Sequence, residues 1–296
     1  MIKYVKRHFM AYLMVLPLVI GLAMFSIYPP IRGILMSFFD LQKITDPLKG
    51  TPNLNNYKEL FKDPIFLQSI KTMFTLQTPR FVVNCTIPFI YGELIYLVKN
   101  KRLKSLYRLL ILLPIVCPSI VYSLIWSNIY GYEGGLLNEL LQKLHITSTN
   151  IDFLDRDHII GALIFMGFPW LPGVSAIIVY SGLANIPSDV IEASRVDGCK
   201  TFRRIWIIDL PYLIGQIKYI VVFGIINIFQ DYSNQLLFAS RVGTKIHVPA
   251  YYMYQLVNTN QSIGKASAIG VILFIIIMLI TIITYKFLNS KEDSNA

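Results

Sequence analysis

Charged residues are scarce in this sequence. Only 15% of its 296 residues are Asp, Glu, Lys or Arg, whereas 54% are hydrophobic, and the mean hydropathy is +0.54. Soluble domains carry roughly a quarter charged residues. Three long runs, Phe9–Ile27, Phe81–Val98 and Ala266–Tyr285, contain Glu93 as their one charged residue. Because about 20 helical residues cross the ~30 Å hydrocarbon core of a bilayer, the composition excludes a soluble globular protein.

Cysteine, histidine and catalytic motifs are also sparse. The three cysteines show no Cys-x-x-Cys spacing and the four histidines are scattered, which excludes a disulfide framework and indicates no metal site. No Gly-x-x-x-x-Gly-Lys-Ser/Thr, Gly-x-Ser-x-Gly or His-Glu-x-x-His motif occurs. We therefore expect no catalytic residue, no metal and no cofactor held by this chain.

The apolar segments predict an all-α integral membrane protein with six transmembrane helices. We place the spans near residues 9–29, 79–98, 106–130, 159–184, 212–237 and 266–287, within a single domain that covers 1–296. The first apolar run follows Lys3, Lys6 and Arg7 but has no small-x-small cleavage site, so we interpret it as an uncleaved helix rather than a secretory signal. Arg80, at the start of the second span, is expected to snorkel to the outer interface.

The basic residues predict the orientation. Because basic residues gather in short cytoplasmic loops, we expect both termini to be cytoplasmic in a multi-pass protein of the cell membrane. The same rule explains the net charge of +10 without a nucleic-acid partner. The clusters assigned to the inner side are Lys3, Lys6 and Arg7, then Lys99, Lys101, Arg102, Lys104 and Arg108, and then Arg195, Lys200, Arg203 and Arg204.

The inner loop at residues 185–211 has an unusual pattern. Pro187 suits the first turn of a helix, and Gly198 suits its end because glycine takes the left-handed conformation at little cost. A second helix then runs toward Pro211 near the membrane boundary. From these residues alone, an ordinary connecting loop and a helix–turn–helix that projects from the membrane are equal alternatives.

The spacing of this loop resembles the EAA loop of ATP-binding-cassette importer permeases, which is Glu-Ala-Ala, three residues, Gly, nine residues and Ile-x-Leu-Pro. Stretches such as Tyr28-Pro29, Asn56-Tyr57 and Gly264–Ala268 resemble the carbohydrate-uptake permeases, and residues 239–249 depart from them. Ser194 replaces the second alanine, and both residues are small. The matching positions are Glu192, Ala193, Ser194, Asp197, Gly198, Ile208, Leu210 and Pro211.

The resemblance implies the transmembrane domain of a type I importer. Such a permease subunit forms half of the path for a sugar or oligosaccharide and works with a second, related but different permease subunit. It also needs two copies of a cytoplasmic ATPase, which bind the ATP and Mg, and an extracytoplasmic solute-binding protein. Glu192 and Arg195 would make polar contacts with the ATPase, and Ala193 and Ser194 would allow close approach. The alternative for Glu192 and Arg195 is a solvated intrahelical pair.

Polar side chains inside the spans are candidates for the substrate path, because they are costly in lipid. Four of them follow helical spacing on one face of span five and suit sugar hydroxyls: Asn227, Gln230, Asp231 and Asn234. Tyr122, Trp126 and Trp170 could present aromatic faces to a sugar. Glu93 could line the path or bond to a neighbouring helix. Interhelical contacts explain the polar stripe equally well, and an interfacial belt explains the aromatic residues.

Other transport classes stay open. The EAA spacing also occurs in importers of peptides and other solutes. A stand-alone secondary transporter would show inverted repeats or coupling charges, which fits this sequence poorly. A membrane enzyme would need clustered acids, bases or metal ligands, and the sequence offers none.

Overall fold

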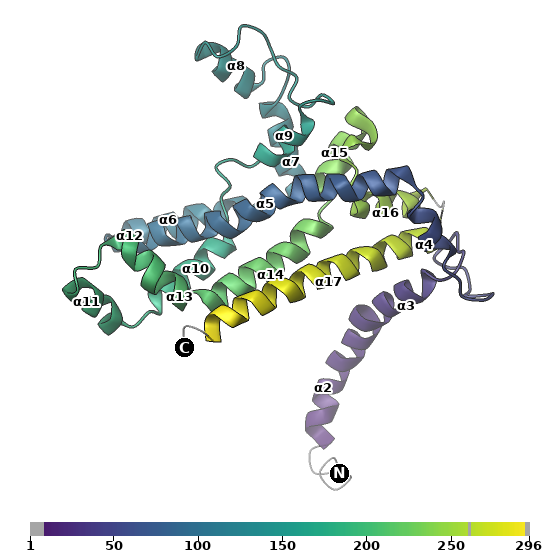
Figure 1. Cartoon of the computed structure of the whole chain (residues 1–296), viewed down its shortest axis with the longest axis horizontal. Coiled ribbons are helices and arrows are strands. Elements are labelled where there is room, and N and C mark those ends of the chain that lie inside the picture. Colours follow the sequence, from purple (N-terminus) through teal and green to yellow (C-terminus); the bar gives the residue numbers. More distant parts are fainter. Residues whose placement is uncertain (1–8, 260–261, 294–296) are drawn as a thin grey trace. The chain divides into compact units, whose positions relative to one another are not determined.

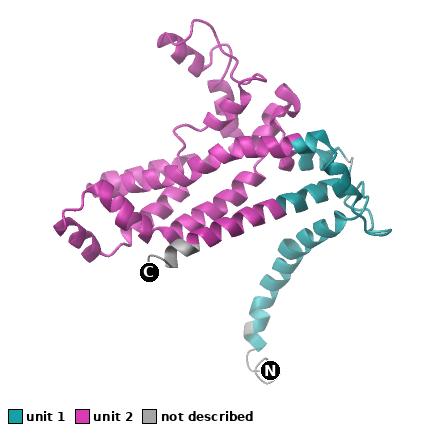
Figure 2. Ribbon diagram, viewed as in Figure 1, with its two compact units in different colours: residues 1–67, 252–274 teal, residues 68–251, 275–296 magenta. Residues whose placement is uncertain are grey.

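The computed structural model describes residues 9–259 and 262–293, which form helices joined by loops, with no β-strand among them. The basic residues Lys3, Lys6 and Arg7 lie outside the described part. The chain divides into two compact units (Figure 2). The first comprises residues 1–67 and 252–274, and the second comprises residues 68–251 and 275–296.

The first unit contains the N-terminal helix. Helices α2 (Phe9–Gly21) and α3 (Tyr28–Met36) are joined by a π-helical turn, Leu22–Ile27, and their apolar side chains are largely exposed, as lipid-facing side chains would be. The short helix α4 (Asn55–Leu60) follows. The buried amide of Asn56 donates to the carbonyls of Ser37 and Phe39 at 3.0 and 2.9 Å, and so fixes α4 to the end of α3.

Three helices contain residues of both units. These are α5 (Pro64–Leu97), α16 (Pro249–Asn258) and α17 (Ile263–Asp293) (Figure 1). The remaining helices of the second unit are α6 (Lys101–Leu112), α7 (Ser119–Ile129), α8 (Leu136–Lys143), α9 (Ile159–Phe165), α10 (Val174–Ala184), α11 (Ser188–Val196), α12 (Thr201–Arg204), α13 (Leu210–Tyr212), α14 (Ile214–Gln230) and α15 (Ser233–Val242).

Several predicted spans are broken helices. The span at 106–130 bends by 94° between α6 and α7, where Pro114 and Pro118 cannot supply backbone N–H donors. The span at 159–184 is interrupted between α9 and α10 by a segment with two prolines. By length and composition, two helices could cross a membrane, or up to five if each bent pair is one span. The count of six stays a prediction, and α5 begins well before residue 79.

The core of the second unit joins the inner loop to the long helices. Leu183 of α10, Ile191 of α11 and Leu213 before α14 lie in one buried cluster, against which Phe89 and Tyr96 of α5 pack. Figure 1 shows α11, α12 and α13 at the end of this unit where α5 terminates. This cluster packs α11 against α10 and the start of α14.

Candidate functional site

The inner loop folds as a helix, a glycine turn and a second helical segment. Helix α11 ends in a Schellman motif, in which the N–H of Cys199 bonds to Ser194 O at 2.9 Å and the N–H of Gly198 bonds to Arg195 O at 3.1 Å. Gly198 has φ +69°, the left-handed region that favours glycine. The sequence prediction of a helix, a glycine turn and a helix is confirmed.

The surface of this loop is both charged and apolar. Glu192, Ala193 and Arg195 are exposed on α11, whereas Ser194 is buried and donates its hydroxyl to Ile191 O at 2.7 Å. Exposed apolar side chains flank them: Val196 is 88% exposed, and Phe202 and Trp206 pack edge-to-face while remaining 73% and 61% exposed. An apolar surface of this kind, bordered by charges, is typical of a protein interaction site. Of the other motif positions, Asp197 is exposed, and Ile208, Leu210 and Pro211 are half-buried.

A buried ionic cluster lies behind this surface. Arg204, which ends α12, donates through Nε to Asp209 Oδ2 at 2.9 Å, and its Nη2 lies 3.8 Å from Glu93 Oε2 on α5. Asp209 is fully buried, and Arg204 and Glu93 are 8% and 5% exposed. The Arg204 guanidinium also lies over the ring of Tyr96, 5.5 Å from its centroid. The cluster ties the inner loop to α5, because an unpaired buried charge is strongly unfavourable.

A second polar region lies nearer the N-terminal end of α5. Arg80 donates through Nη1 to Asp231 Oδ2 and to Gln77 Oε1, both at 3.2 Å. Arg80 and Tyr122 line two cavities, of about 250 and about 100 Å³. Asn84 and Trp170 line the larger cavity, and Ser123, Asp231 and Asn234 line the smaller one.

The polar stripe predicted for span five is not one helical face. Helix α14 ends at Gln230, Asp231 is extended with ψ 128°, and α15 begins at Ser233. The Asp231 carboxylate accepts from the N–H of Ser233 at 3.0 Å, which supports the start of the new helix. Because of this break, Asp231 and Asn234 line the small cavity, whereas Asn227 and Gln230 are exposed and line neither cavity.

A comparison with known protein families identifies the class of protein that contains this inner loop and these cavities. The family of binding-protein-dependent transport system inner membrane components matches residues 87–293. The chain belongs to this family. The match includes the whole inner loop and most of the residues around the two cavities, and it starts after Arg80 and Asn84.

Two curated relatives span nearly the whole permease. A probable ABC transporter permease protein, YesP of Bacillus subtilis (strain 168), is 28% identical, covering 95% of this chain and 91% of YesP. The sulfoquinovosyl glycerol transport system permease protein SmoG of Agrobacterium fabrum is 26% identical, covering 96% of this chain and 91% of SmoG.

A solved structure has the same fold. A chain of a bacterial ABC transporter involved in the import of the acidic polysaccharide alginate superimposes with a TM-score of 0.83 at 19% sequence identity. The superposition covers 97% of this permease and 98% of that chain. The permease is therefore a helical inner-membrane component with the fold of an ABC importer subunit.

The structure separates the residues predicted for the substrate path. Tyr122, Trp170, Asp231 and Asn234 line the cavities beside Arg80. Trp126 instead packs on Tyr130, with ring centroids 5.3 Å apart, and does not line these cavities. Glu93, near the C-terminal end of α5, instead lies with Arg204 and Asp209 at the inner loop.

Sequence reasoning missed several residues of both regions. Arg80 lies within the long helix α5, which begins at Pro64, and pairs with Asp231, a partner that the sequence did not indicate; its place at the outer interface stays a prediction. Arg204 and Asp209 were overlooked because their charges look like ordinary members of a polar loop. One local signal could have identified Asp209 as a buried charge. It is the one charged residue in the otherwise apolar stretch Ile205–Leu213.

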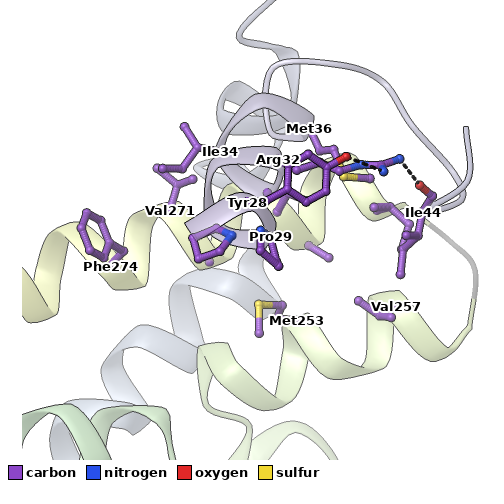
Figure 3. A pocket seen from close by; sticks show the side chains of 16 residues that line it. Tyr28, Pro29, Arg32, Ile34, Met36, Ile44, Met253, Val257, Val271 and Phe274 are labelled. Carbon is purple, nitrogen blue, oxygen red and sulfur yellow. Dashed lines mark hydrogen bonds between the residues drawn. The ribbon is translucent and has the colours of Figure 1, made fainter. Parts of the chain in front are cut away.

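The first unit contains a larger but apolar pocket of about 540 Å³, formed by α3, α16 and α17 (Figure 3). Tyr28, Met253 and Phe274 are among its lining residues. Arg32 at its edge is engaged by Tyr28 Oη at 3.2 Å and Ile44 O at 3.0 Å. With so few polar groups, this pocket does not suit sugar hydroxyls.

Proposed function

We propose that this chain is one permease subunit of an ATP-driven, binding-protein-dependent importer of a sugar or oligosaccharide. The observation that carries the proposal is the structure of the inner loop in a member of the binding-protein-dependent family. Helix α11 is exposed, it has the motif spacing from Glu192 to Pro211, and it ends at a glycine in the left-handed conformation. SmoG, a relative over nearly the whole chain, bears the name of a transport system for a sugar derivative.

The inner loop couples ATP hydrolysis to the membrane helices. A cytoplasmic ATPase docks on Glu192, Arg195 and the exposed apolar side chains beside them. When the ATPase dimer closes, it displaces α11. Ile191 and Leu183 transmit this displacement to α10 and α14 through the shared cluster, so the permease switches by a rigid-body movement between inward-open and outward-open states.

The proposal includes the wider assembly. The chain crosses the cell membrane six times with both termini cytoplasmic and pairs with a second, related permease. Two ATPase copies bind ATP and Mg, so this chain is not an enzyme. An extracytoplasmic binding protein delivers the sugar. The Lys104 side chain, which donates to Tyr96 O at 3.0 Å, and the basic residues near it suit the cytoplasmic end.

The first test is affinity purification of the tagged chain from its native cells in mild detergent, followed by mass spectrometry. We expect an ATPase and a second permease at comparable amounts. A chain that purifies alone and moves a solute into liposomes without ATP would refute the proposal.

A paired variant experiment tests the coupling loop directly. Glu192→Arg should reduce the amount of co-purified ATPase because it reverses the charge on the exposed face of α11. Glu139→Arg, an equivalent reversal at an exposed position of α8, is the control and should retain the ATPase. Equal recovery with both variants would exclude α11 as the docking helix.

A further inference from the structure

The larger of the two cavities that Arg80 lines has a cation in its wall. Arg80 is the one charged residue among the described residues that line its ~250 Å³. The side chain of Asp231, the acid that pairs with Arg80, lines the adjoining ~100 Å³ cavity and not the larger one. The larger cavity therefore presents a cation that no acidic side chain in its own wall neutralises.

The Arg80–Asp231 pair is also incomplete as an arginine–carboxylate contact. One guanidinium nitrogen, Nη1, donates to Asp231 Oδ2 at 3.2 Å, and the same nitrogen donates to Gln77. The other carboxylate oxygen of Asp231, Oδ1, is engaged by the N–H of Ser233. Because arginine binds carboxylates best through two parallel hydrogen bonds, this single contact leaves room for a second anion on the guanidinium.

The other walls suit a sugar ring. Tyr122 and Trp170 supply aromatic surface, and Asn84 supplies an amide. The volume of about 250 Å³ is below the ~300–1,000 Å³ of pockets for drug-sized ligands, so it suits one sugar unit rather than a whole oligosaccharide.

We propose that Arg80 makes this cavity a binding site for an anionic sugar, whose carboxylate or sulfonate group pairs with the guanidinium. The inference rests on the proposed importer function and adds the charge class of its substrate. Asp231 holds Arg80 in place when the cavity is empty, and the anion of the substrate shares or replaces that contact. A neutral sugar offers hydroxyl groups alone and forms weaker hydrogen bonds with the cation.

The test uses the complete importer, purified through the tagged chain and reconstituted in liposomes with its binding protein. The probes are digalacturonate, sulfoquinovosyl glycerol and neutral galactobiose, and the measured quantity is the ratio of anionic to neutral uptake with ATP. For wild type we expect uptake of at least one anionic probe to exceed that of galactobiose. The two anionic probes distinguish a carboxylate from a sulfonate substrate.

Variants test whether Arg80 sets this ratio. Arg80→Gln should lower the ratio by about 10- to 100-fold, as expected for the loss of a charged hydrogen bond, and Arg80→Lys should restore part of it. The double variant Arg80→Gln/Asp231→Asn removes both charges, avoids an unpaired acid, and should show the same lowered ratio. Arg241→Gln breaks another arginine–aspartate pair, with Asp152 at 2.7 Å, and should leave the ratio unchanged.

The outcomes separate the two proposals. If galactobiose is imported with ATP and the ratio is the same in wild type and both Arg80→Gln variants, the anionic site is refuted while the importer function stands. If the wild-type complex takes up the probes equally well with and without ATP, the importer function itself fails.

Discussion

Arg204 and Asp209 form a buried ion pair inside the inner loop, with Nε and Oδ2 2.9 Å apart. The pair spans the π-helical turn Ile205–Asp209, and Glu93 approaches it from α5. Two acids thus share one arginine in a place that excludes water. This arrangement fixes the loop that the ATPase is proposed to move.

Removing the arginine should destabilise the permease. Arg204→Met leaves Glu93 and Asp209 buried without a counter-charge, which costs about 3–5 kcal/mol for a buried pair. We expect a lower thermal unfolding midpoint of the purified protein in detergent. Arg203→Met, at the exposed neighbouring position, is the matched control. Equal midpoints for the two variants would contradict a structural role for the cluster.

The left-handed glycine should be required for coupling. Gly198→Val places a β-branched residue at φ +69°, a conformation that costs an ordinary residue about 1–2 kcal/mol. No atom lies within 4 Å of the position of an added Cβ, so the effect comes from backbone strain and not from a clash. We expect normal membrane insertion but reduced transport and reduced sugar-stimulated ATPase activity. Gly198→Asn tolerates this conformation and should retain most activity.

The break after α14 changes which polar residues matter for uptake. Asn234 is buried and accepts from Ser123 Oγ at 2.9 Å in the small cavity, whereas Gln230 is exposed outside it. Asn234→Leu should therefore reduce sugar uptake more strongly than Gln230→Leu, because it removes the hydrogen bond to Ser123 and replaces a polar group in the wall of the small cavity with an apolar one. Initial uptake rates, normalised to the amount of permease in the membrane, would check this order. The reverse order would contradict a role for the small cavity in the substrate path.

Close packing at Gly264 should limit substitution there. An added Cβ would overlap the carbonyl oxygen of Phe39 and lie 2.7 Å from the Asn56 amide, so Gly264→Ala should destabilise the first unit by about 1–3 kcal/mol. At Gly270 the nearest atom would be Met253 Sδ at 3.4 Å, an ordinary contact. Limited proteolysis should therefore cleave Gly264→Ala faster than Gly270→Ala.

One loop carboxylate should have a pH signature. The backbone N–H of His158 bonds to Asp155, and this bond lowers the pKa of the Asp155 carboxyl below its ordinary value. A depressed folded-state pKa means that the contribution to stability is present above the unfolded-state pKa and is lost as the pH falls through the folded value. Carboxyl ¹³C NMR of the wild type, compared with Asp155→Asn, should reveal this low-pH titration. A titration at the ordinary aspartate pKa would contradict the contact.

Local sequence was sufficient for the inner loop. A helix-compatible run before a glycine, with motif spacing to Pro211, predicts α11 and its turn, because glycine conformation and capping depend on neighbouring residues. Long apolar runs likewise predict the helical membrane class, since hydrophobic length is a local property.

Tertiary structure alone decided where the charges meet. Arg80 and Asp231 are far apart in sequence, as are Glu93 and Arg204, and each pair forms because separate helices pack side by side. Helical spacing could not reveal the break at Asp231, since the geometry there is shaped by contacts with Arg80 and Ser233. The sequence by itself therefore determined the helical membrane class and the glycine turn of the inner loop. Packing between distant segments decided the cavities and the pairing of Arg80 with Asp231 and of Glu93 with Arg204, because those contacts have no periodic signal along the chain.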